Sequence, residues 1–218
     1  MATHARARLL DTAEELFYAE GIRAVGVERI LAESGVGRAS FYRHFTGKDE
    51  LVVAVLTRRD RAWRDWLAAG VAERGGRPLD VFDALAERFA RADFRGCAFI
   101  NTMVETADPD SPAHRVAAAH KRAVVGYVAG LLAAEGRSEE EAAALARRLV
   151  LLMDGAIVTA LREGTPAAAA EARAVAAALL AGAGTGTAGA GTAGAGAGGA
   201  GAGGAALDES CAAAADRG

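Results

Sequence analysis

The sequence is poor in the residues that build disulfide frameworks and metal sites. Two of its 218 residues are cysteine, Cys97 and Cys211, and their spacing fits neither kind of structure. Proline occurs four times, which leaves long stretches free to form helices. No run of about 18 apolar residues lacks charges, and the start of the chain lacks the apolar core of an export signal. We therefore expect a soluble, cytoplasmic protein with no membrane-spanning helix, metal or cofactor.

The charges of the chain nearly cancel. Its 25 basic and 28 acidic residues leave a net charge of −3, which argues against binding nucleic acid through a broad basic surface. Hydrophobic residues make up 52% of the chain and alanine dominates them, a composition typical of helices. The length allows one or two domains with a sizeable core. We predict an all-α fold, in which nucleic-acid binding would depend on where a few charges point.

Residues 27–45, VERILAESGVGRASFYRHF, have the pattern of two short helices joined by a tight turn. Apolar residues recur at helical spacing in the first half, and the helix is expected to end at Gly35. Glycine suits that position because only a residue without a Cβ enters the left-handed region cheaply. Gly37 is then the expected N-cap of a second helix, from Arg38 to Phe45.

The second helix of this pair has two different faces. Phe41 and Phe45 are four residues apart, so they share one face and can close a core. The other face offers groups that suit DNA: arginine for guanine edges, hydroxyls for phosphates and a small alanine for close approach. These residues are Arg38, Ala39, Ser40, Tyr42, Arg43 and His44. The pattern indicates a helix-turn-helix, with a merely solvated charged face as the alternative.

This region resembles the TetR family of bacterial transcriptional regulators. The resemblance extends from RARLLDTAEELFYAEGI through the helix pair to TGKDEL, and it is most specific at residues 41–45 with Lys48 after them. It implies an N-terminal three-helix helix-turn-helix domain over residues 1–47, and it implies that Lys48, directly after this domain, contacts a phosphate. A larger helical ligand-binding and dimerisation domain would follow over residues 48–181, giving about nine helices. Residues 182–218 are rich in glycine and alanine, have little to bury, and are predicted to be a disordered tail.

Other helix boundaries are marked by residues that suit helix ends. Thr46 is the expected N-cap of the fourth helix, with Asp49 as its partner, and that helix is expected to reach about Arg74. A later amphipathic helix is predicted to end near Phe94. Similar start signals are Ser111 with Pro112 and Ser138 with Glu141.

The resemblance also implies a small-molecule effector, bound among the helices of the second domain. Candidate lining residues are Trp63, Trp66, Phe89, Met103, Tyr127 and Met153, and polar residues that could orient a ligand are Asn101, Glu105, His120 and Asp154. The aromatic and aliphatic members predict a largely apolar effector, although ordinary core packing would account for them as well. Cys97 is expected to be a small buried apolar residue, with redox sensing as the alternative.

These features predict a DNA-binding transcriptional regulator. We expect a repressor that binds a palindromic double-stranded DNA operator as a homodimer and is released by its effector. The alternative is a regulator without an effector, acting by occupancy or through a protein partner. The homodimer would form through the last two helices, which could instead close the monomer core. An enzyme is not expected, because His114 and His120 lie six residues apart and do not share a helix face, so neither a catalytic nor a metal site is predicted.

Overall fold

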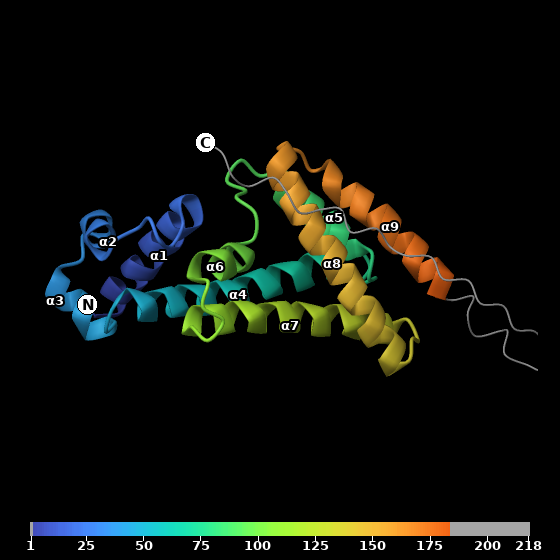
Figure 1. Cartoon of the computed structure of the whole chain (residues 1–218), viewed down its shortest axis with the longest axis horizontal. Coiled ribbons are helices and arrows are strands. Elements are labelled where there is room, and N and C mark those ends of the chain that lie inside the picture. The colour runs from blue at the N-terminus through green and yellow to red at the C-terminus, as the bar shows by residue number, and fades with distance from the viewer. Residues whose placement is uncertain (1, 184–218) are drawn as a thin grey trace, which may run out of the picture. The chain divides into compact units, whose positions relative to one another are not determined.

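The chain is entirely helical where the structure describes it. The computed structural model describes residues 2–183, and this range forms nine helices and no strand (Figure 1). The helices are α1 (Ala2–Glu20), α2 (Val27–Ser34), α3 (Arg38–His44), α4 (Lys48–Ala72), α5 (Asp80–Phe89), α6 (Ala98–Thr106), α7 (Pro112–Ala134), α8 (Glu139–Glu163) and α9 (Ala167–Ala183). The all-α prediction is confirmed, and none of these helices is both long and apolar enough to cross a membrane. The predicted tail lies, from residue 184 onward, outside the described residues.

Several helix ends lie at residues that suit a cap. Gly35 follows α2 in the left-handed conformation, with φ 63° and ψ 23°, which would strain any other residue. At the start of α8, the Ser138 hydroxyl accepts a hydrogen bond from the backbone N–H of Glu141, and the Glu141 carboxylate accepts one from the Ser138 backbone N–H. Gly164 ends α8 in the left-handed conformation. These caps set the helix lengths and therefore the faces that reach the core.

Two predicted boundaries are wrong. The N-cap of α4 is Gly47 and not Thr46, whose backbone N–H and hydroxyl both donate to the Glu50 carboxylate, at 2.7 and 2.8 Å. Glu50, rather than the aspartate before it, therefore bonds back across the helix start. The second error concerns α5, which ends at Phe89 and not near Phe94. The chain turns there, so that the Phe94 ring packs on Phe89 with the centroids 5.0 Å apart.

Two hydrophobic cores organise the described residues. The first, which we call the head core, joins α1, α2 and α3 (together the head) to the N-terminal half of α4. Its members include Leu9, Ala13, Ile30, Phe41, Phe45, Leu51 and Val55. Phe99 of α6 and Ala117 of α7 belong to it as well. Burying each large apolar side chain contributes about 1.5–3 kcal/mol, so later helices help to stabilise the head.

The second core, which we call the body core, lies among α5, α7, α8, α9 and the C-terminal half of α4. Leu67 and Val71 of α4 are 1% and 0% exposed within it. Leu51 and Val55, earlier on the same helix, belong to the head core. α4 also packs along α7 (Figure 1). A single helix of 25 residues therefore connects the two cores.

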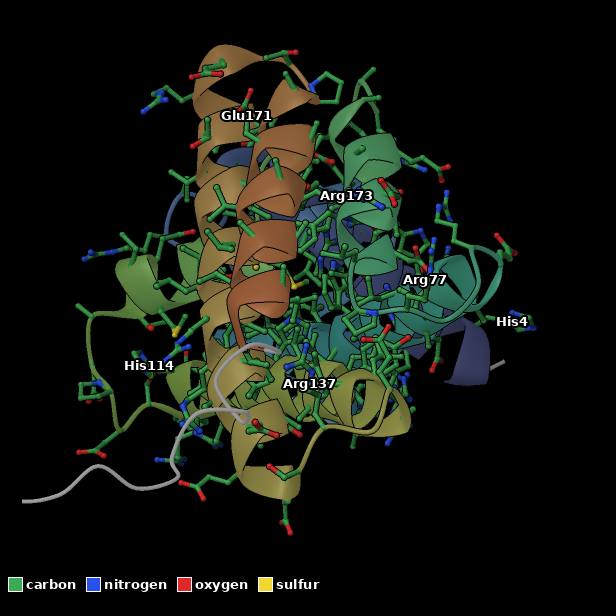
Figure 2. The ribbon with its side chains drawn as sticks, turned by 90° about the vertical axis from the view of Figure 1, so that its right-hand side faces the viewer. His4, Arg77, His114, Arg137, Glu171 and Arg173 are labelled. Atoms are coloured by element: carbon green, nitrogen blue, oxygen red, sulfur yellow. The ribbon has the colours of Figure 1, made fainter. Side chains whose placement is uncertain are left out.

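Hydrogen bonds and packing hold one side of α9 against the other helices. Arg173 points from α9 towards α5 (Figure 2), where its Nε donates to Asp83 at 3.1 Å. Further along, Arg137 from the loop before α8 donates to the Leu180 carbonyl at 2.8 Å. α9 also packs against α8. The opposite side of α9, together with the neighbouring side of α8, is left exposed.

Candidate nucleic-acid interface

A short turn of three residues joins α2 to α3. Val36, in the middle of the turn, is buried, and its backbone N–H donates to the Ser34 hydroxyl at 3.3 Å. Gly37 then precedes α3 with an extended backbone, φ −66° and ψ 148°. Its carbonyl accepts a hydrogen bond from the Phe41 N–H at 3.1 Å. The turn therefore has the form expected of a helix-turn-helix.

α3 separates a buried face from an exposed one. Phe41 and Phe45 are 0% and 2% exposed, and their ring centroids are 5.9 Å apart. Arg6 of α1 lies over the Phe45 ring, 5.4 Å from its centroid. Tyr42, on the other side, is 53% exposed. Of the predicted DNA contacts, Arg38, Ala39, Tyr42 and Arg43 are exposed, and Ser40, His44 and Lys48 are half-buried. The packed phenylalanines thus hold α3 so that a polar surface faces outward.

The cations of this surface differ in how they are paired. Arg38 lies 2.6 Å from Glu28 of α2, and both side chains are exposed. Such a pair contributes about 0–1 kcal/mol, so Arg38 can exchange Glu28 for a DNA phosphate or base at little cost. Arg43 and Lys48 form no ion pair with any residue that the structure describes. Lys48 is also the first residue of α4, where the helix dipole adds positive potential. This arrangement favours contact with a phosphate backbone.

Hydrogen bonds tie the head to the residues around α6. The Tyr18 hydroxyl donates to the Gly96 carbonyl at 3.2 Å and accepts from the Arg95 backbone N–H at 2.9 Å. The Glu105 carboxylate, on α6, accepts from the Arg23 backbone N–H at 2.8 Å. These bonds link the end of α1 and the loop after it to the helices that follow. The head is therefore linked by hydrogen bonds to α6 and to the loop before it.

Trp63 and His120, two of the predicted effector contacts, pack against each other. His120 is 2% exposed, its Nδ1 lies 2.8 Å from Asp60 Oδ1, and its ring stacks on Phe99 with the centroids 3.6 Å apart. The Trp63 ring meets it edge-on at 4.9 Å. Burial lowers the pKa of His120 to about 4, against the opposing effect of Asp60. The imidazole is therefore neutral at pH 7 and donates its Nδ1 proton to the Asp60 carboxylate.

The other predicted effector contacts lie in several different environments. Phe89 and Met153 are buried in the body core, and Trp66 and Tyr127 pack against it partly buried. Asp154 pairs with Lys121, with 2.5 Å between Oδ1 and Nζ. On α6, Asn101 donates to the Arg95 carbonyl at 3.3 Å, and Met103 packs against the head core. The structure thus assigns these residues packing or pairing roles, and contact with an effector stays a prediction.

A charged cleft between α1, α4 and α5 was not expected from the sequence. Its volume is about 410 Å³. The lining residues are Asp11, Glu14, Glu15, Tyr18, Arg58, Arg59, Arg88, Arg91, Asp93 and Phe94. They come from α1, α4, α5 and the loop after α5, so no local motif marks them.

α3 is held in place by buried phenylalanines, presents arginine and tyrosine outward, and follows a turn that contains glycine. This arrangement defines a helix-turn-helix DNA-binding protein. Residues 9–55 match the family model described as bacterial regulatory proteins, tetR family, and residues 79–175 match that of the transcriptional regulator LmrA/YxaF-like, C-terminal domain. The crystal structure of SCO4454, a TetR-family transcriptional regulator from Streptomyces coelicolor, is similar to this chain, with 36% sequence identity and a TM-score of 0.75. The similarity covers 83% of this chain and 90% of that one. The chain therefore belongs to the TetR family of bacterial transcriptional regulators.

Curated relatives are transcriptional regulators of the helix-turn-helix type. YxaF of Bacillus subtilis is 25% identical over 169 residues, which covers 74% of this chain and 88% of YxaF. A regulator of Lactococcus lactis is 27% identical over 103 residues, or 45% of this chain. The chain spans about half, 53%, of the length of that relative. The family and the fold indicate a DNA-binding regulator of transcription and not an enzyme.

Proposed function

We propose that the chain is a repressor that binds a palindromic operator as a homodimer and leaves it when a small-molecule effector binds. The observation that carries the proposal is the outer face of α3, where Tyr42 is 53% exposed while Phe41 is fully buried. In a two-fold dimer, α3 of each copy would enter successive major grooves about 34–36 Å apart. Arg43 and Tyr42 then contact bases and phosphates, and Lys48 a phosphate.

The exposed side of α8 and α9 supports a homodimer. Leu151 and Val158 of α8 are 73% and 52% exposed, and Val175 of α9 is 49% exposed. Gly155 lies between the two α8 residues, and the 151–155–158 spacing aligns them along one helix face. Exposed apolar stripes of this kind are typical of protein–protein contacts. Two copies related by a two-fold axis would bury the same surface from both sides, as the family resemblance implies.

Release requires an effector that binds the DNA-free conformer better than the DNA-bound one. α4 and the hydrogen bonds from Tyr18 and Glu105 connect the head to the remaining helices, so a change in their packing would alter the spacing of the two recognition helices. The aromatic and aliphatic side chains among the helices behind the head favour an effector with a largely apolar body. A regulator that acts by occupancy or a protein partner is the alternative. Operator release by small molecules separates the two.

Selection of operator sequences from random duplex DNA tests the proposal. Wild-type protein should enrich a palindrome, because a two-fold dimer reads two equivalent half-sites. Tyr42→Ala and Arg43→Ala should each weaken binding to that palindrome by about 1–3 kcal/mol without loss of helicity. Fluorescence anisotropy with the selected operator gives the affinities, and circular dichroism checks the fold.

Arg122→Ala is the matched control for Arg43→Ala. Arg122 is an exposed arginine on α7, and like Arg43 it forms no ion pair with a described residue. It should bind the operator as wild type does. No enrichment from folded dimeric protein, or equal losses in the Arg43 and Arg122 variants, would show that α3 does not read DNA.

A further inference from the structure

The cleft between α1, α4 and α5 serves neither DNA contact nor the exposed face of α8 and α9. Its volume of about 410 Å³ lies in the range of about 300–1,000 Å³ that small-molecule sites occupy. One wall is α1 of the head, and the others are α4, α5 and the loop after α5. A molecule bound there would contact the head and the helices behind it at the same time.

The two arginines of α4 in this cleft already have acceptors. Arg58 lies 2.6 Å from Asp11 and 2.7 Å from Glu14, and Arg59 lies 3.0 Å from Glu14. Arg59 also lies over the Tyr18 ring, 4.1 Å from its centroid. These contacts join α4 to α1 and use the carboxylates of Asp11 and Glu14. The charges on the α1 side of the cleft are therefore largely compensated.

Arg88 of α5 is in a different situation. It is half-buried, and its side chain forms no hydrogen bond or ion pair with any residue that the structure describes. Its guanidinium lies over the Trp66 ring, 5.1 Å from the centroid, and burial lowers the pKa of Arg88. The nearby carboxylate of Asp93 is engaged by Arg91 at 2.9 Å. A partly desolvated guanidinium with five N–H donors is costly unless an anion meets it.

The cleft also has aromatic walls, supplied by Tyr18 and Phe94. The Tyr18 hydroxyl is occupied by the Arg95 N–H and the Gly96 carbonyl, and Arg59 lies over its ring. A ligand can therefore contact only the part of the ring that Arg59 leaves uncovered. The Phe94 ring is steadied against Phe89, with 5.0 Å between centroids. An apolar ligand body would gain by covering these rings. The cleft thus combines an arginine without an acceptor and two aromatic surfaces.

We propose that this cleft binds a small monocarboxylate, with its carboxylate on the Arg88 guanidinium and its apolar body against Tyr18 and Phe94. A planar carboxylate matches the forked donors of arginine and can accept two hydrogen bonds from it. A dianionic phosphate suits the cleft less well, because Glu15, which forms no ion pair with a described residue, also lines it and repels a second negative charge.

The inference deepens the proposed function by naming the class of effector, and its regulatory consequence rests on that function. It places the effector in this cleft rather than among the contacts predicted from the sequence, none of which lines the cleft. A carboxylate held by Arg88 lies beside the ion pairs that join α4 to Asp11 and Glu14 of α1. It therefore favours one arrangement of α1 against α5. If that arrangement differs from the DNA-bound one, the ligand lowers operator affinity.

Calorimetric titration of the full chain with benzoate, phenylacetate and hexanoate tests the site. At least one acid should bind saturably with a Kd below about 1 mM. Benzamide, which lacks the charge, and inorganic phosphate, which lacks the apolar body, should bind more weakly. Arg88→Gln should weaken binding by about tenfold or more. Arg88→Lys should weaken it less, because lysine keeps the charge but not the planar fork.

Arg122→Gln, outside the cleft, is the matched control and should bind the acids as wild type does. The inference is overturned if none of the three acids binds saturably to folded protein, if benzamide binds as well as benzoate, or if wild type and both Arg88 variants bind equally. If Arg88→Gln does not fold, the comparison of wild type with Arg88→Lys tests the inference.

Operator binding without ligand is measured on the same preparation. Its absence would refute the proposed function and leave carboxylate binding intact, whereas carboxylate binding without effect on operator affinity would contradict the regulatory step.

Discussion

His120 lies where the two hydrophobic cores meet. Its ring stacks on Phe99, a member of the head core, and contacts Trp63, which packs against the body core. Its Nδ1 is satisfied by Asp60 at 2.8 Å. This environment suits a neutral imidazole, because a buried charge between aromatic rings loses its hydration. The protonation state of one side chain is therefore coupled to the packing of both cores.

The stability of the protein should fall as the pH drops from 6.5 towards 4. Burial lowers the pKa of His120 from 6.5 to about 4, so the unfolded chain takes up the proton first and is favoured at acidic pH. Each pKa unit is worth about 1.4 kcal/mol, and His120 should therefore account for a loss of up to about 3 kcal/mol across this range. Urea unfolding between pH 7.5 and 4.5 measures it.

A pair of asparagine variants isolates the contribution of His120. His120→Asn can still donate to Asp60 but does not titrate, so it should be less stable at pH 7.5 and show a flatter pH dependence. His4→Asn replaces an exposed histidine of α1 and should keep the wild-type slope. Equal slopes in wild type and His120→Asn would show that burial does not suppress protonation of this ring.

At the residue scale, the spacing of residues within one helix predicted which side chains face inward. It did not predict which side chains of different helices contact each other. Phe41 and Phe45 were predicted to share a helix face because they are four residues apart, and both are buried, although Phe45 caps α3 and does not lie within it. The bond between Asp60 and His120 joins residues 60 positions apart and depends on how α4 packs along α7. The bond between the Glu105 carboxylate and the Arg23 N–H was likewise not predicted from the sequence, and the ligand contact of Glu105 stays a prediction. A sequence offers many acidic residues that could accept a given hydrogen bond, and the packing of the helices decides which of them does.

At the scale of single elements, the start of α8 offers a direct test of capping. Ser138→Ala removes the hydroxyl that accepts from Glu141 N–H at 3.3 Å and leaves that donor without its cap. The expected loss is about 1 kcal/mol of unfolding free energy. Thr57→Ala is the control, since Thr57 lies exposed within α4 and its hydroxyl only donates back to Val53. Alanine at that position should be neutral or slightly stabilising. If both variants lost the same unfolding free energy in urea, the effect would come from the loss of a hydroxyl in general and not from the loss of the cap.

Helix boundaries were predictable where a residue has a strong conformational preference. Gly35 and Gly164 end helices in the left-handed region, which follows from the absence of a Cβ. The end of α5 was not predictable, because Phe89 and Phe94 both suit a core. Only the observed turn lets both rings pack together, and a turn that forms to satisfy packing leaves little local signal.

At the scale of the whole molecule, the unpartnered surface of α8 and α9 predicts assembly. Arginine at Leu151 or Val158 would place a charge in the centre of that surface and, in a two-fold dimer, opposite its own copy. Arg148, one turn before Leu151, is also exposed and adds to the repulsion. Leu151→Arg and Val158→Arg should therefore be folded monomers at concentrations where wild type sediments as a dimer. Analytical ultracentrifugation measures this.

Val104→Arg supplies the control for both variants. Val104 is an apolar residue of α6 with 75% exposure, so it matches them in chemistry and exposure but lies off the surface of α8 and α9. It should remain dimeric and bind the selected palindrome as wild type does. The two monomeric variants should keep the weak affinity of one half-site, because α3 and the head core are untouched, and lose the gain from binding two half-sites together. Dimers that persist in both α8 variants would place the interface elsewhere, and wild-type operator affinity in a proven monomer would mean that one head suffices for recognition.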